Sequence, residues 1–252
     1  MKHLSQEFMT DFQEQRINLI QMTKVRIAAA VNHDILIIQA LNTVDDLTTQ
    51  LNSLSKRLRD WYSYSVPEVD RAIDDHEAYC QMVAGKTRVE LVDEFVKGQE
   101  MGAALDEADY IAVQSLARQV TEIYQFKQSL LHYLEARLKK LLPNMTALAG
   151  TTIAARLLAG AGSAKKLALL PASTIQLLGA EKALFRHLRS GAKSPKHGHI
   201  FNHPVVQKAK REDKGKAARM LADKLALCAR LDYFGGEFKA DEYRKSLEAR
   251  FQ

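Results

Sequence analysis

The stretch IIQALNTVDDLTTQLNSLSKRLRDW, Ile37 to Trp61, decides the fold class. Apolar or small side chains recur in it at alternating steps of three and four residues, the heptad pattern of a helix that packs along one stripe. The stripe consists of Ile37, Ala40, Val44, Leu47, Leu51, Leu54, Leu58 and Trp61. No proline precedes Pro67 and no glycine precedes Gly85, so none of the usual helix breakers interrupts this region.

A second stripe with the same spacing lies farther along the chain. Its apolar members are Val113, Leu116, Val120, Ile123, Leu130, Leu134 and Leu141; Lys127 and Arg137 fill the other register positions, and Phe126 and Leu138 lie beside them. Because a helix cannot leave an apolar stripe in water, we predict that the two helices pair as a long antiparallel coiled coil. The residues from about 62 to 104 then form a helical insertion at its tip, since Val66-Pro67 ends the first helix. One half of an ordinary helical bundle is the alternative.

The composition changes after Pro143, which ends the second long helix. The following residues are rich in alanine, glycine and leucine and lack the heptad, which predicts a compact helical unit. No alternating strand pattern of useful length occurs anywhere, so we expect an all-α chain. We predict an N-terminal helix with a coiled-coil dimerisation domain over 1–142 and a second domain over 143–252.

The chain has 252 residues, a formal net charge of +6 and two cysteines. The charge is unevenly divided, with −5 on residues 1–142 and +11 on residues 143–252. No apolar run reaches the roughly 18 residues of a membrane span and the N-terminus lacks a secretory apolar region, so we expect no membrane association. Two cysteines in helical-looking stretches favour a reducing, intracellular setting.

Two motifs invite readings as ligand sites. GAGSAKK, Gly160 to Lys166, lacks the spacing and the preceding strand of a phosphate loop, so we expect Gly160 and Gly162 to close one helix and Ser163 to cap the next. The segment PKHGHIFNHP holds His197, His199 and His203, which leaves a zinc site, a ligand-contacting loop and a structural loop open. No hydrolase or metalloprotease motif occurs, so we expect no catalytic residues, no metal and no cofactor.

Basic residues are concentrated between residues 171 and 232, where thirteen lysines and arginines face five acids. Lys182, Arg186 and Arg189 share one face of a predicted helix, and Lys216, Arg219 and Lys224 form a similar stripe on a later one. Two basic faces joined by a loop rich in histidine, proline and lysine predict a cradle for a phosphate backbone.

Three segments resemble the Nop domain family of box C/D guide-RNA particle scaffolds. They are GAEKALFRHLRSGAKSPKHGHIFNHP (Gly179 to Pro204), KGKAARMLADKLALCARLDYF (Lys214 to Phe234) and LRDWYSYSVPE (Leu58 to Glu68). The resemblance covers about residues 30 to 250. It implies a homodimer formed through the coiled coil and a Nop domain that recognises a kink-turn RNA together with a small, ribosomal-type kink-turn-binding protein. The family directs ribose 2′-O-methylation through fibrillarin, which binds an N-terminal domain that we expect to be absent from this chain.

The resemblance also implies site residues. RNA contacts are expected at Gln176, Glu181, Lys182, Arg186 and Arg219, with Lys193, Lys196, His197, His203, Lys214 and Lys216 as further candidates. The run from Ala183 to Arg186 occupies the place where relatives approach the end of the guide–substrate duplex. Coiled-coil and dimerisation contacts are expected at Leu47, Leu51, Leu54, Leu58, Leu116, Val120, Ile123, Leu130 and Leu134.

Alternative functions remain open on the sequence alone. Within the family, the alternative is a spliceosomal-type scaffold that binds a kink-turn particle without methylation. Other classes are a metal-dependent nuclease that uses the three histidines of the loop, and a purely structural coiled-coil adaptor. The expected location is cytoplasmic for an archaeal chain and nucleolar for a eukaryotic one.

Overall fold

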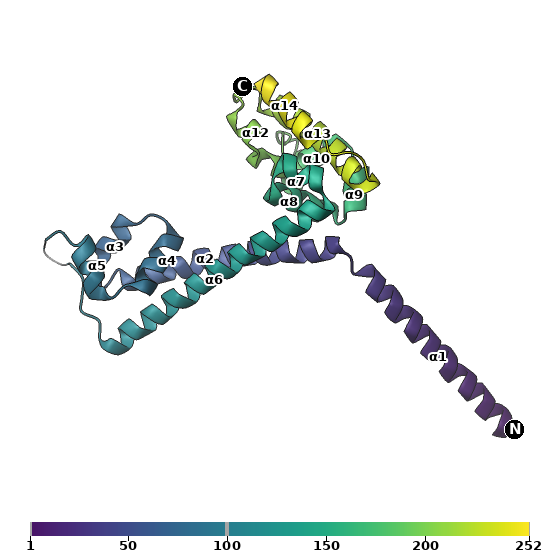
Figure 1. Ribbon diagram of the computed structural model, residues 1–252, viewed down its shortest axis with the longest axis horizontal. Helices are drawn as coiled ribbons and strands as arrows, with labels where there is room; N and C mark the ends of the chain where they lie inside the picture. Colours follow the sequence, from purple (N-terminus) through teal and green to yellow (C-terminus); the bar gives the residue numbers. More distant parts are fainter. Residues whose placement is uncertain (1, 99–100, 252) are drawn as a thin grey trace. The chain divides into compact units, whose positions relative to one another are not determined.

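The computed structural model describes residues 2–98 and 101–251, and these residues form helices without any strand (Figure 1). The helices before residue 98 are α1 (Lys2–Ala30), α2 (His33–Tyr62), α3 (Pro67–Ala72), α4 (His76–Gly85) and α5 (Arg88–Phe95). Those after residue 101 are α6 (Glu107–Leu141), α7 (Pro143–Ala149), α8 (Thr151–Ala161), α9 (Ala164–Leu169), α10 (Ala172–Leu177), α11 (Glu181–Ser190), the 3₁₀ helix η1 (His199–Asn202), α12 (Pro204–Lys208), α13 (Lys214–Phe234) and α14 (Ala240–Phe251). The all-α prediction is confirmed.

The chain is organised as two compact units, and the insertion unit, residues 40–136, lies within the sequence of the other. In it α2 and α6 run antiparallel, as two contacts indicate. The hydroxyls of Ser55 in α2 and Tyr124 in α6 lie 3.2 Å apart, and the Ala103 amide, just before α6, donates to the Tyr64 carbonyl, just after α2. Helices α3, α4 and α5 contribute side chains to the same core, which includes the fully buried Tyr79. The predicted insertion at the tip therefore contains three short helices that share the core of the long pair.

Seven of the residues predicted for the apolar stripes belong to this core. They are Leu51, Leu54, Leu58, Val113, Leu116, Val120 and Ile123. The stripes are displaced in places, since Trp61 is 36% exposed whereas Tyr62 is fully buried. On α6 the more deeply buried neighbours of Val120 are Ala117 and Tyr124 rather than Leu116 and Ile123. The expectation that Trp61 ends the buried stripe is therefore wrong; heptad packing along the full helices stays a prediction.

Helix boundaries follow local capping chemistry. Pro67 and Pro143 occupy the first turns of α3 and α7, where the missing proline N–H costs no helical hydrogen bond. Gly162 ends α8 in the left-handed conformation (φ 80°), and the Ser163 hydroxyl accepts a hydrogen bond from the Lys166 amide at 3.2 Å, as predicted. Gly160, in contrast, lies inside α8.

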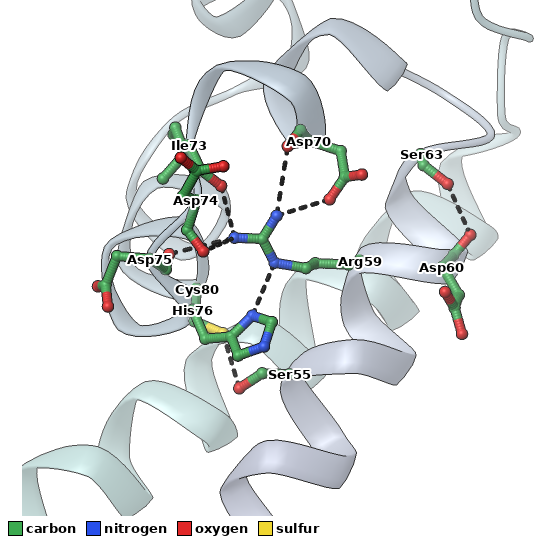
Figure 2. A network of polar contacts seen from close by, with 10 residues as sticks. All are labelled: Ser55, Arg59, Asp60, Ser63, Asp70, Ile73, Asp74, Asp75, His76 and Cys80. Atoms are coloured by element: carbon green, nitrogen blue, oxygen red, sulfur yellow. Dashed lines mark hydrogen bonds and ion pairs between the residues drawn. The ribbon is translucent and has the colours of Figure 1, made fainter.

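Arg59 of α2 holds the segment between α3 and α4 (Figure 2). Its guanidinium donates to the Asp70 carboxylate at 2.7 Å, to His76 Nδ1 at 2.8 Å and to the Asp74 carbonyl at 3.0 Å. It also lies 4.3 Å from the centroid of the Tyr79 ring. Arg59 therefore ties the backbone between α3 and α4 to α2, while the Asp74 and Asp75 side chains stay exposed.

The second unit, which we call the C-terminal unit, joins residues from 137 onward with residues up to 39. Its central helix is α13, which packs against α7, α9, α10, α12 and α14. Buried alanines at 217, 218, 222, 226 and 229 allow close approach of these helices. The Asp232 carboxylate accepts hydrogen bonds from the amides of Asn144 and Met145, each at 2.9 Å, and thereby anchors the start of α7 to the end of α13.

Among the described residues, no single helix has the length and apolarity to cross a membrane. One bent pair, Phe12–Ala28 with His33–Tyr62, passes that test of length and composition only when its two members are combined.

Candidate nucleic-acid interface

An open groove on the C-terminal unit gathers residues from several predicted RNA-contacting segments. It has a volume of about 890 Å³ and is lined by Gln176, Lys193, Ser194, Pro195, Lys196, Glu212, Asp213, Gly215, Lys216, Arg219, Met220 and Arg250. We call it the basic groove. Five of its lining residues, Gln176, Lys193, Lys196, Lys216 and Arg219, were predicted from the sequence as RNA contacts. Residues more than 40 positions apart in the chain therefore share one surface.

The groove is electropositive for two reasons. The side chains of Lys193, Lys196, Lys216 and Arg219 are all exposed, so their charges face solvent. The groove also includes Gly215 and Lys216 from the first turn of α13, a 21-residue helix whose N-terminal end carries partial positive charge. Asp213 offsets part of this charge through an ion pair with Lys216 at 2.9 Å. The balance still favours an anionic ligand.

The loop that carries Lys193 and Lys196 is bonded to the end of α10. The Gly198 amide donates to the Gln176 carbonyl at 2.8 Å, and the Gln176 side-chain amide donates to the Lys196 carbonyl at 2.6 Å. These bonds link the end of α10 to the loop that follows α11. Gln176 is thus involved in holding the loop as well as lining the groove.

A second basic cluster lies on α11. Lys182, Phe185, Arg186, Arg189 and Ser190 line a shallow hollow of about 430 Å³. No side chain of α11 is buried, and Phe185 is 67% exposed, so the helix presents charge and an aromatic ring together. These groups suit a ligand that carries phosphates and flat bases.

The side chain of Glu181, at the start of α11, forms a hydrogen bond within the protein. Its carboxylate accepts a hydrogen bond from the Gly179 amide at 2.7 Å, and this bond lowers the pKa of Glu181. The carboxylate therefore stabilises the turn between α10 and α11.

Two histidines of the loop, His197 and His203, have different environments. The His197 ring stacks on Phe201 with centroids 4.3 Å apart, and the Lys214 ammonium lies 5.2 Å from the Phe201 centroid. His203 is buried: its Nε2 lies 2.9 Å from the Leu148 carbonyl, and its Nδ1 accepts from the Val205 amide at 3.2 Å. Both ring nitrogens of His203 are used, so the structure gives it a packing environment rather than access to a ligand.

The zinc and nuclease alternatives receive no support from this arrangement. Within the described ranges, no group of three His, Cys, Asp or Glu side chains is placed to hold a metal ion.

Sequence reasoning did not identify Arg250 and Glu212 as groove residues. Arg250 belongs to α14 and reaches the groove only through the packing of that helix in the C-terminal unit. No spacing in the sequence indicates such proximity. Glu212 was counted only as one of the five acidic residues between residues 171 and 232.

Comparison with protein families gives a match over most of the chain. The family model described as "Nop: snoRNA binding domain, fibrillarin" matches residues 43–252. The uncharacterized NOP5 family protein of Methanocaldococcus jannaschii is 40% identical over 248 residues, which cover 91% of this chain and 59% of that protein. Nucleolar protein 58 of Homo sapiens is 37% identical over 238 residues, covering 87% of this chain and 45% of the relative.

Among solved structures, the crystal structure of a fibrillarin/Nop5p complex contains a similar fold. Its TM-score is 0.57 at 24% sequence identity, with 95% of this chain and 77% of that chain covered. The chain spans about half the length of the curated relatives that it matches.

Proposed function

Because the chain belongs to the Nop family, we propose that it is a non-enzymatic scaffold of a box C/D guide-RNA ribonucleoprotein. The observation that carries the proposal is the basic groove, in which four exposed cations from a loop and from α13 face the same open space. The names of its relatives, a NOP5 family protein and nucleolar protein 58, designate no enzyme.

The basic groove and the α11 cluster have complementary roles in this proposal. Lysine and arginine side chains of the groove bind phosphates and fix the register of the RNA. On α11, Phe185 adds an apolar surface to Lys182 and Arg186, which suits the end of a stacked duplex. In this proposal residues 143–252 bind the RNA.

The partners follow from family membership. We propose that the RNA is a kink-turn of a box C/D guide RNA already bound by a small kink-turn-binding protein. Fibrillarin supplies the methyltransferase activity of the particle. The corresponding location is cytoplasmic in an archaeon and nucleolar in a eukaryote.

A gel-shift titration at fixed salt tests RNA binding. Arg219→Ala and Lys182→Ala, from the groove and from α11, should each weaken binding to the kink-turn protein–RNA complex by about 1–3 kcal/mol. Lys165→Ala, which removes an exposed lysine of α9, is the matched control and should bind like the wild type. Wild-type protein that retains no kink-turn complex at low salt would instead favour the structural-adaptor alternative.

We also propose that the scaffold is a homodimer. Leu51, Leu58 and Val120 pack inside the chain, so they cannot form the surface between two copies. The insertion unit leaves other apolar side chains exposed, including Tyr64 at 69% and Met101 at 77%. We therefore expect Tyr64→Glu or Met101→Glu to shift the mass measured by light scattering toward the monomer. A wild-type mass equal to one chain would refute dimerisation.

A further inference from the structure

The contact between the turn after α10 and the loop that follows α11 depends on two glycines. At Gly179, a Cβ atom would lie 2.5 Å from the Cε1 and Nε2 atoms of His199, so the imidazole ring lies directly on the glycine backbone. The φ angle of Gly179 is also positive, at 88°. At Gly198, a Cβ atom would lie 1.9 Å from the Leu178 carbonyl oxygen. Neither position has room for a larger residue.

Backbone hydrogen bonds accompany this close approach. The His199 amide donates to the Leu178 carbonyl at 2.7 Å, next to the Gly198–Gln176 bond described above. The imidazole of His199 thus packs the loop that carries Lys193 and Lys196 against the turn after α10. The other two predicted cations of the groove, Lys216 and Arg219, belong to α13, and the packing of that helix holds them in place.

We propose that His199 is a positioning residue for RNA binding: its ring, held against Gly179, fixes the lysine-bearing loop of the basic groove before the ligand arrives. This inference rests on the proposed function. A ligand that meets a fixed loop does not have to order it, so preorganisation increases affinity without adding a contact.

The effect of His199 should therefore differ from that of a charge contact. His199→Ala should weaken RNA binding about 10-fold, which equals the cost of fixing one additional backbone residue on binding. The dependence of affinity on salt should stay unchanged, because no phosphate contact is removed. Lys196→Ala should reduce the slope of log K against log salt by about 1.

The experiment compares His199→Ala, His199→Phe and Lys196→Ala with the wild type. The probe is a kink-turn RNA bound to its small protein, titrated at several salt concentrations and corrected for the active fraction of each preparation. His199→Phe keeps a flat ring and should bind within about 3-fold of the wild type, the range expected when packing is retained. Hydrogen exchange of the Gly198 and His199 amides in the free proteins is the second measurement. We expect protection in the wild type and its loss in His199→Ala.

Four results would overturn the inference. They are wild-type affinity in His199→Ala, a salt slope reduced as in Lys196→Ala, a Phe variant as weak as the Ala variant, and unprotected amides in the wild type. The exchange measurement on wild-type protein needs neither a folded variant nor RNA. If the wild type binds no RNA, the proposed function fails, while amide protection still decides whether His199 holds the loop.

Discussion

Arg59 shows how one side chain organises residues that are far from it in sequence. In the sequence it directly follows Leu58 of the apolar stripe, a position at which arginine normally faces solvent. In the structure its side chain is only 12% exposed and binds the backbone between α3 and α4 as well as Asp70 (Figure 2). The sequence shows the acids and the arginine, but their convergence depends on how the insertion folds back.

We predict that Arg59→Lys destabilises the protein by about 1–3 kcal/mol, because an ammonium cannot reproduce the planar set of donors and leaves partly buried acceptors without partners. Urea unfolding followed by circular dichroism measures the change. Arg57→Lys is the control, because the Arg57 side chain is 75% exposed and its ion pair with the Asp60 carboxylate is long, at 3.9 Å. This substitution should change stability by less than about 0.5 kcal/mol. Equal effects at both positions would contradict the role of Arg59.

His203 makes stability depend on pH. Burial lowers the pKa of His203 below its ordinary value of about 6.5, and protonation of Nδ1 would also remove the acceptor for the Val205 amide. Because the unfolded chain takes up this proton first, the contribution of His203 is complete above about pH 6.5 and is lost as the pH falls below it. The wild-type melting temperature should therefore decrease from pH 7.5 to pH 5.

His203→Gln should flatten this pH profile, because glutamine can donate to the Leu148 carbonyl without titrating in this range. Burial also lowers the pKa of His197, so some slope in the same direction should remain. Melting curves of both proteins across this pH range provide the measurement. A variant profile parallel to that of the wild type would show that His203 is not responsible.

At the scale of helices, the heptad pattern predicted α2 and α6 but not which residues are buried most deeply. A stripe defined by spacing alone cannot decide between Trp61 and Tyr62, because two neighbouring aromatic side chains both satisfy it. The insertion helices α3 to α5 decide the outcome, since they add a third packing surface that buries Tyr62 with Tyr79. Long periodic helices are thus predictable, while burial at their ends depends on tertiary neighbours.

The candidate site was predictable to a similar degree. Spacing and charge identified the loop at 193–203 and the start of α13, and these do line one groove. The same reasoning could not show that His203 points into the core whereas Lys196 faces the groove, because both lie in one irregular segment. The side on which each residue of a loop lies is determined by bonds such as that between His203 and Leu148.

Helix α13 tolerates little added volume on its buried face. Ala222 is fully buried among the helices packed around α13. We predict that Ala222→Leu destabilises the protein by about 1–3 kcal/mol through overpacking. Chemical unfolding gives the value, and Asp223→Leu, which places the same side chain at the adjacent exposed position, should cost less than about 0.5 kcal/mol. A neutral Ala222→Leu variant would mean that the packing around α13 is loose.

At the scale of the whole molecule, the sequence division at 142/143 and the compact units differ. The change of composition after Pro143 marks where the second long helix ends. The compact units instead divide both long helices, at 39/40 and at 136/137. The start of α2 belongs to the C-terminal unit because the buried Asp34 carboxylate accepts a hydrogen bond from the Ala164 amide at 3.0 Å. A contact between residues 130 positions apart cannot be predicted from the local composition of the sequence.

We predict that Asp34→Ala destabilises the C-terminal unit by about 1–3 kcal/mol, because the Ala164 amide loses its buried acceptor. Hydrogen exchange monitored residue by residue should show faster opening of α9 and its neighbours. Asp46→Ala, which changes an exposed carboxylate of the same helix, serves as the control. Faster exchange confined to residues 40–136 would contradict the assignment of Asp34.

The hydrogen bond between Asp34 and Ala164 also affects the order in which the two units can fold during synthesis. A ribosome that adds about 5–20 residues per second needs roughly 7–26 s to make the 130 residues between them. During that interval the nested segment 40–136 emerges whole and has every partner for its own core, whereas the beginning of α2 has none. The insertion unit can therefore fold on the nascent chain before the C-terminal unit has all of its residues.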